Sequence, residues 1–192
     1  MRTSIYMIAI LPPEPIYSEV QEFKKRFVDA YDSKEAYRRP PHITVIPPFQ
    51  YAQEDEAKLI NFLTKFLKKY SPFELSFDGF GTFEKRVIFV QPEKNERLKM
   101  LFKDITKAFN KEFKVREGNS SSLPYAPHMT IGYKDLKPAM YDLAWQEFSS
   151  KIYRRKYMLG ELYLMRHTGQ KWVTVSEAQF AFNPEGELTL GF

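Results

Sequence analysis

Pro41-His42-Ile43-Thr44-Val45 and Pro127-His128-Met129-Thr130-Ile131 are two near-copies of one pattern, Pro-His-apolar-Thr-apolar. They lie 86 positions apart, from residue 42 to residue 128, in a chain that has only three histidines. Successive side chains of a β-strand point to opposite faces, so the His and the Thr of each copy share one face and the apolar residues share the other. Each copy therefore predicts a strand that buries its apolar side and presents one imidazole and one hydroxyl.

Helices and strands are expected in a similar order around each copy. Apolar residues at spacings of three and four predict helices, and alternating apolar runs bounded by Gly and Pro predict strands. The expected helices are 16–32, 54–70, 93–113 and 138–150. The expected strands are 2–11, 42–46, 73–77, 86–91, 128–133, 157–166, 171–182 and 187–190, and residues 114–126 are expected to form a polar loop.

The order of these elements predicts an internal repeat. The first histidine corresponds to the second, and the strand around Val87 corresponds to the strand around Trp172 at an offset of 85. We therefore expect an α+β fold with two pseudo-symmetric antiparallel β-sheets, flanked by helices, around a central cleft. The prediction is a single bilobal domain over residues 1–192, with the first motif at 42–45 and the second at 128–131.

The composition narrows the class of protein. The chain has 192 residues, of which 43% are hydrophobic and 16% aromatic, as is typical of a globular protein. It has no cysteine, which excludes a disulfide framework and a thiolate metal site. The apolar run at 5–11 is too short for a signal peptide, and no run reaches the roughly 18 residues of a membrane span. We expect a cytoplasmic monomer without membrane contact.

The net charge of +5 allows two interpretations. Surplus lysine on the surface of a soluble protein is the simpler one. An anionic ligand, such as a phosphate ester or a nucleic acid, is the other.

Two imidazoles and two hydroxyls that face one cleft would suit phosphodiester chemistry. An imidazole titrates near neutral pH, so one ring can accept a proton while the other donates one. Threonine hydroxyls can donate hydrogen bonds to the non-bridging phosphate oxygens. Such a site requires no metal and no cofactor. One His-x-Thr alone is typical of an ordinary strand with a hydrogen-bonded histidine, and the second copy in the same setting favours a paired site.

The two motifs resemble those of the 2H phosphoesterase superfamily, which includes the RNA 2′,5′-ligase-like proteins and cyclic nucleotide phosphodiesterases. The family pattern is two His-x-Thr/Ser-apolar motifs, one in each lobe; the length, the lobe order and Phe49 after the first motif are also similar. The resemblance implies a bilobal α+β fold and metal-independent action on 2′,3′-cyclic phosphates or 2′,5′ linkages, as in RNA processing. It also implies catalysis by His42, Thr44, His128 and Thr130.

Three further residues are candidates for substrate binding. Arg38 and Arg39 precede the first motif and could meet a phosphate, with solvated loop charges as the alternative. Tyr125, three residues before the second histidine, could stack on a base or pack in the core. The third histidine, His167, invites a three-histidine metal site, but its spacing does not fit one. We expect a structural or cleft-rim role for it.

The leading hypothesis is a metal-independent phosphoesterase that acts on a cyclic or 2′-linked nucleotide or RNA end. A second hypothesis is a nucleotide- or RNA-binding module that uses the same cleft without turnover. A third is a metal-dependent hydrolase that uses His42, His128 and His167. The sequence leaves open the natural substrate, the direction of the reaction, the pathway, and which motif histidine is the base.

Overall fold

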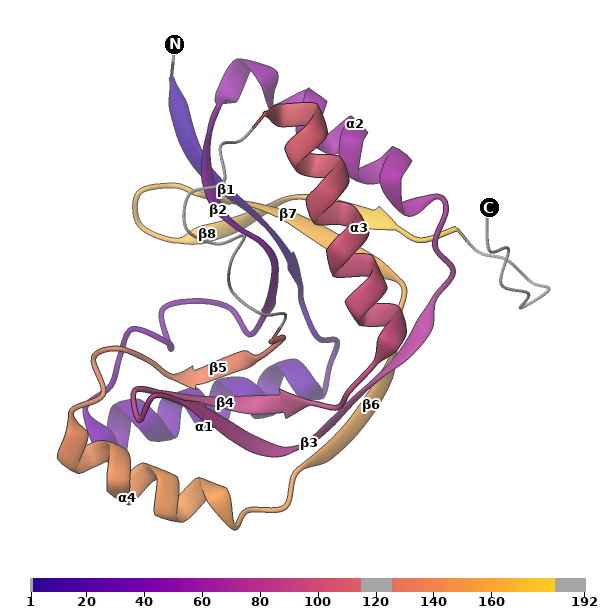
Figure 1. The fold of residues 1–192 in the computed structure, drawn as a ribbon. Helices are drawn as coiled ribbons and strands as arrows, with labels where there is room; N and C mark the ends of the chain where they lie inside the picture. Colours follow the sequence, from indigo (N-terminus) through magenta and orange to yellow (C-terminus); the bar gives the residue numbers. More distant parts are fainter. Residues whose placement is uncertain (1, 115–125, 182–192) are drawn as a thin grey trace.

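Two four-stranded antiparallel sheets form the framework of the structure (Figure 1). The structure is a computed structural model, and it describes residues 2–114 and 126–181. Within these ranges, sheet A has the strand order β2-β1-β7-β8 and sheet B has the order β5-β4-β3-β6. The strands are β1 (Thr3–Ile10), β2 (Ile43–Ala52), β3 (Phe73–Phe83), β4 (Val87–Pro92), β5 (Met129–Gly132), β6 (Arg154–Leu159), β7 (Glu161–His167) and β8 (Trp172–Gln179). The strand expected over residues 187–190 lies outside the described residues.

Two helices pack against each sheet. Helices α1 (Ile16–Tyr31) and α4 (Pro138–Ser149) contact sheet B through β5 and β3. Helices α2 (Glu56–Leu67) and α3 (Glu96–Phe113) contact sheet A through β7, β8 and β2 (Figure 1). A short 3-10 helix, Gln53–Asp55, precedes α2. The predicted α+β class, with two helix-flanked sheets, is therefore confirmed.

Local residues set the ends of these helices. Helix α3 begins after Asn95, whose side-chain oxygen accepts a hydrogen bond of 3.0 Å from the backbone N–H of Leu98. It ends at Lys114, which has a left-handed backbone conformation, and α1 ends at Asp32 in the same way. Helix α4 has Pro138 in its first turn, where the missing N–H costs no hydrogen bond.

The two halves of the chain exchange strands between the sheets. In each sheet the motif strand lies at one edge, with β1 or β4 beside it. The third strand of sheet B is β3, which follows the first motif, and the third strand of sheet A is β7, which follows the second. The predicted correspondence of Val87 with Trp172 is wrong, because β4 adjoins its motif strand whereas β8 lies at the far edge of its sheet. An internal repeat would give this matching order, and the repeat itself stays a prediction.

A second prediction is wrong at residues 157–166, where we expected one strand. Strand β6 ends at Leu159 in sheet B, and β7 begins at Glu161 in sheet A, so the chain changes sheets at Gly160. Side chains alternate in both strands alike. The apolar pattern therefore does not reveal that the hydrogen-bonding partner changes half-way.

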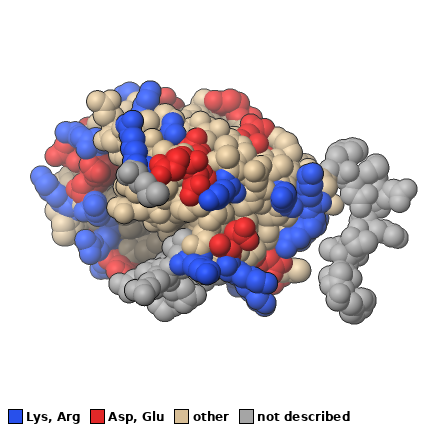
Figure 2. Space-filling model, turned by 90° about the horizontal axis from the view of Figure 1, so that it is seen from above, with Lys and Arg blue, Asp and Glu red and all other residues tan. Residues whose placement is uncertain are grey.

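One extended apolar core joins both sheets to their helices. A smaller buried cluster lies on β1 and β7 and consists of Met7, Ala9 and Met165. Because Tyr6 to Ile10 are all buried, β1 is covered on both faces. On the face seen in Figure 2, basic and acidic side chains are interspersed. In the part of the chain that the structure describes, no helix has the length and apolar character of a membrane span.

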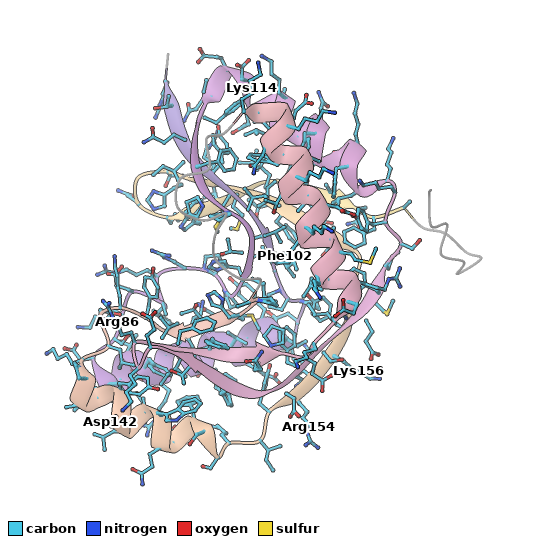
Figure 3. The ribbon with its side chains drawn as sticks, in the orientation of Figure 1. Arg86, Phe102, Lys114, Asp142, Arg154 and Lys156 are labelled. Atoms are coloured by element: carbon cyan, nitrogen blue, oxygen red, sulfur yellow. The ribbon has the colours of Figure 1, made fainter. Side chains whose placement is uncertain are left out.

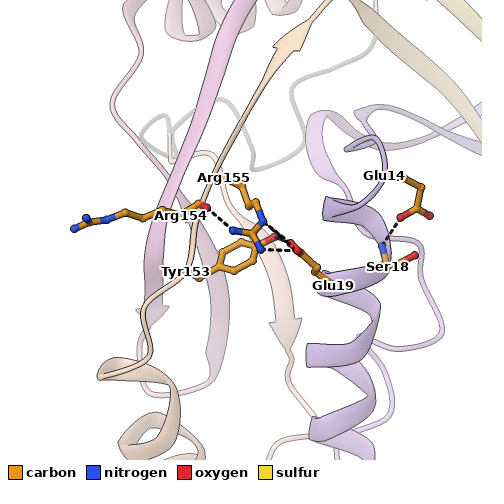
Figure 4. A network of polar contacts seen from close by, with 6 residues as sticks. All are labelled: Glu14, Ser18, Glu19, Tyr153, Arg154 and Arg155. Atoms are coloured by element: carbon orange, nitrogen blue, oxygen red, sulfur yellow. Dashed lines mark hydrogen bonds and ion pairs between the residues drawn. The ribbon is translucent and has the colours of Figure 1, made fainter.

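A polar network fixes α1 against sheet B (Figure 4). The carboxylate of Glu19 accepts hydrogen bonds of 2.6 Å from Nη2 and 2.9 Å from Nε of Arg155, and one of 2.8 Å from the hydroxyl of Tyr153. The Arg155 guanidinium, as the largest cause, lowers the pKa of Glu19 below its usual value. The network therefore ties the first turn of α1 to the beginning of β6.

Candidate active site

The two motif strands contact each other although they belong to different sheets. Strand β2 begins at Ile43 and β5 begins at Met129, so each motif histidine stands immediately before its strand. Both strands begin with the same burial pattern: the apolar residues are buried and the intervening threonine is half-buried. The alternation predicted for the two motifs is confirmed. It leaves two imidazoles and two hydroxyls partly accessible: His42, Thr44, His128 and Thr130.

The same hydrogen bond holds both imidazoles. Nδ1 of His42 lies 2.7 Å from the carbonyl oxygen of Pro40, and Nδ1 of His128 lies 2.9 Å from that of Ala126. A carbonyl oxygen can only accept, so Nδ1 is the protonated nitrogen and donates. Among the described residues, none forms a hydrogen bond to either Nε2. Each Nε2 can therefore accept a proton or, once protonated, donate one.

Basic side chains lie near His42. Burial is the largest cause that lowers its pKa, and the charges of Lys24, Arg39 and His128 lower it further, to about 4. The hydrogen bond to Pro40 acts in the opposite direction and is outweighed. The motif strands β2 and β5 contact each other, which brings the charge of His128 near enough to act on His42. His42 is consequently neutral at physiological pH.

Aromatic rings surround His128. The ring centroid of Phe83 lies 5.0 Å from that of the imidazole at an interplanar angle of 89°, and the centroid of Phe89 lies at 5.4 Å. Burial lowers the pKa of His128 as well. Gly81 leaves room for this arrangement, because a Cβ at that position would lie 2.5 Å from the ring of Phe89. The two histidines thus form the same hydrogen bond through Nδ1 but differ in the side chains around them.

Comparison with known families agrees with this geometry. Residues 12–171 match the family described as the 2′-5′ RNA ligase superfamily. The chain belongs to this superfamily. Two bacterial relatives cover similar shares of both chains. "Putative phosphoesterase GK0864" of Geobacillus kaustophilus is 28% identical over 138 residues, 71% of this chain and 72% of its own. "Putative phosphoesterase OB1230" of Oceanobacillus iheyensis is 27% identical over 154 residues, 78% of this chain and 77% of its own.

Solved structures share the fold of this superfamily member. TT0787 of Thermus thermophilus has a TM-score of 0.69 and 14% identity over 93% of this chain and 99% of its own. E. coli LigT, in its complex with 3′-AMP, has a TM-score of 0.61 and 16% identity over 93% and 99%. At these identities the likeness concerns the fold alone. It confirms the predicted arrangement of two antiparallel sheets.

Of the three predicted binding residues, the structure brings Arg39 to the histidine pair. Its side chain is half-buried, with the guanidinium 5.2 Å from the ring centroid of Tyr133, and its charge acts on the first imidazole. Arg38 is exposed and donates a hydrogen bond of 2.7 Å from Nη1 to the carboxylate of Glu35. Tyr125 lies outside the described residues.

The third histidine ends β7 and lies apart from the first motif, because it is level with Ile5 of β1 whereas the residue after His42 is level with Ile10. The ring of His167 packs edge to face against Trp172, with the centroids 5.2 Å apart. Within residues 2–114 and 126–181, no three His, Cys, Asp or Glu side chains come together as a potential metal site. Arg86, which we did not assign, is exposed between β3 and β4 (Figure 3).

The sequence interpretation missed Lys24. Its Nζ donates a hydrogen bond of 2.9 Å to the carbonyl oxygen of Arg39, and its charge reaches His42. A signal for it is present in the sequence. The buried stripe of α1 consists of Ile16, Val20, Lys24, Phe27 and Tyr31, so a lysine occupies a position where the helical period requires a core residue.

Proposed function

We propose that this member of the 2′-5′ RNA ligase superfamily is a metal-independent phosphoesterase that opens 2′,3′-cyclic phosphates or cleaves 2′,5′ linkages at nucleotide or RNA ends. The observation that carries the proposal is the pair of imidazoles, each anchored through Nδ1 and each with an Nε2 to which no residue of 2–114 or 126–181 forms a hydrogen bond. The solved complexes of E. coli LigT with 3′-AMP and with ATP support a nucleotide as the ligand.

In the proposed hydrolysis, His42 is the general base and His128 is the general acid. Nε2 of neutral His42 takes a proton from water while the water oxygen bonds to phosphorus. The bond from phosphorus to one ribose oxygen breaks, and this oxygen takes the proton from Nε2 of His128. Burial and, to a smaller extent, the neighbouring cations favour the neutral form of His42, and the anionic phosphate favours the protonated form of His128.

The two motif hydroxyls complete the proposed site. Thr44 and Thr130 lie on the same strand faces as their histidines and are half-buried. Their hydroxyls would donate hydrogen bonds to the non-bridging phosphate oxygens, whose negative charge grows in the transition state. Arg39 adds a positive charge near the first imidazole and would attract the phosphate.

The test is hydrolysis of a 2′,3′-cyclic nucleotide in the presence of a chelator. We expect His42→Ala and His128→Ala each to lower kcat about 10²–10⁴-fold, because each removes one proton-transfer group. His167→Ala is the matched control and should keep wild-type turnover, since His167 packs on Trp172 away from the pair. A motif variant with wild-type turnover would exclude that histidine from the mechanism.

Other outcomes would favour the alternative functions. Saturable binding of 3′-AMP by folded protein, without product from any cyclic or 2′,5′-linked substrate, would favour a binding module. Activity that is lost in chelator and restored by a divalent metal would favour a metal-dependent hydrolase.

A further inference from the structure

Helix α1 carries a buried lysine. Lys24 is only 2% exposed, and its neighbours in the buried stripe of α1 are apolar or aromatic. Lysine is almost never buried to this degree without a partner of opposite charge. Within the described residues, no carboxylate lies within ion-pair distance of its Nζ. Burial of an unpaired charge costs stability, so stability does not explain a lysine at this position and a functional role is the alternative.

The hydrogen-bond acceptor of the Lys24 ammonium indicates the role of this side chain. Nζ donates to the carbonyl oxygen of Arg39, and the next carbonyl oxygen, that of Pro40, accepts from Nδ1 of His42. Two consecutive carbonyl groups are thus held by two side chains, one from α1 and one from the first motif. The distances are 2.9 Å for the first bond and 2.7 Å for the second.

The segment from Arg39 to His42 has few other means of being fixed. Pro40 and Pro41 have no backbone N–H, so neither can donate a hydrogen bond. The backbone N–H of Arg39 bonds to the carbonyl of Ala36, 3.2 Å away, and so fixes only the beginning of the segment. Side-chain donors must therefore hold the carbonyl groups that orient the imidazole.

We propose that Lys24 is a positioning residue for His42: its ammonium holds the Arg39–Pro40 segment so that Nδ1 stays protonated and Nε2 faces the substrate. The charge of Lys24 also adds to the effect of burial in lowering the pKa of His42. That the oriented imidazole serves catalysis rests on the proposed function. The positioning of His42 by Lys24 can be tested without turnover. Two other charged groups act here. Arg39, on the same segment, acts on both Lys24 and His42, and His128, from the second motif, acts on His42. Burial lowers the pKa of Lys24 itself to about 7.

Two substitutions separate the hydrogen bond from the charge. Lys24→Met has neither, and Lys24→Gln keeps an N–H donor without the charge. Lys25→Met is the matched control, because Lys25 is the next residue of α1 but is exposed and pairs with Asp29. Urea unfolding checks that each variant is folded.

The first readout is the imidazole ¹⁵N NMR spectrum of His42 over a pH series. We expect the Nδ1–H tautomer in the wild type, in Lys24→Gln and in Lys25→Met, and a mixture of tautomers in Lys24→Met. The titration of His42 should move to higher pH in both Lys24 variants, because the nearby cation is gone. An unchanged tautomer and titration in a folded Lys24→Met would overturn the proposal. If Lys24→Met does not fold, an unchanged titration in Lys24→Gln has the same meaning.

The second readout is the pH dependence of kcat and KM on a 2′,3′-cyclic nucleotide. Lys24→Met should lower kcat by up to about 10²-fold with a smaller change in KM, because the base is misplaced rather than removed. The acid limb of the kcat/KM profile should move to higher pH in both Lys24 variants and stay in place in Lys25→Met. If the wild type has no turnover but the NMR changes occur, the positioning role stands and the proposed function fails.

Discussion

The half-buried imidazole of His42 contributes to the pH dependence of the stability of the protein, and His42→Gln should remove that contribution. The pKa of His42 is about 4 in the folded protein, against an ordinary value of 6.5. Above pH 6.5 the ring is neutral in both states. Between pH 6.5 and about 4 the unfolded chain binds a proton that the folded protein does not bind, so stability falls as the pH falls. The difference corresponds to a loss of up to about 3 kcal/mol at 1.36 kcal/mol per pH unit.

The measurement is the free energy of unfolding in urea at pH 7.5, 6.5, 5.5 and 4.5. Wild type and His42→Gln share all other titrating groups, so the difference between their curves isolates the imidazole. Thr44→Val is the control, because it changes the neighbouring polar position of the same strand without removing a titrating group. It should follow the wild-type slope.

Parallel curves for the wild type and His42→Gln would refute the reasoning. They would mean that the imidazole stays solvated enough to bind its proton in the folded protein. The assignment of His42 as a base that is neutral over this range would then lose its physical support. A smaller but clear divergence, of about 1–2 kcal/mol, would mean that water partly screens the site, and the sign would still hold.

Two further substitutions test the surroundings of the site. Gly81→Ala should destabilise the protein by about 1–3 kcal/mol and lower turnover, because the added Cβ would lie 2.5 Å from the ring of Phe89 and push it against the second imidazole. Asp135→Ala should cost about 1–3 kcal/mol in urea unfolding, because the hydroxyl of fully buried Ser33 loses its acceptor at 2.9 Å. Asp142→Ala, on the exposed side of α4, should leave the stability unchanged (Figure 3).

The beginnings of the motif strands could be predicted from the sequence because everything that determines them is local, but the first strand was expected to end at Ile46 and continues to Ala52. Within five residues, the alternation of His42 and Thr44 with buried apolar neighbours requires only the period of a β-strand. The helices were predictable for the same reason, since their apolar spacing is contained in each segment. The two histidine motifs therefore indicated the superfamily before any packing was known.

What the sequence did not reveal depends on partners far apart in the chain. The change of sheet at Gly160 leaves the alternation of side chains intact, so no local pattern records it. The hydrogen bond from Lys24 to the carbonyl of Arg39 joins a helix to a loop fifteen positions away. A lysine in an apolar stripe indicates that its ammonium has a hydrogen-bond partner in the structure. Only the packed structure shows that this partner is the carbonyl oxygen of Arg39.

The motifs do not indicate which histidine is the acid and which is the base, because the two are equivalent within them. The side chains around each histidine distinguish the two. With a pKa of about 4, His42 is protonated in only about one molecule in 10³ at pH 7. As a general acid it would therefore start from a rare state, at a cost of about 4 kcal/mol, whereas as a base it is ready in nearly every molecule. Burial imposes most of this cost, and the charges of Lys24 and Arg39 add to it. Burial lowers the pKa of His128 too, but that imidazole has aromatic rings where His42 has the two cations. In the proposed mechanism, the surroundings of the two motifs therefore favour His42 as the base.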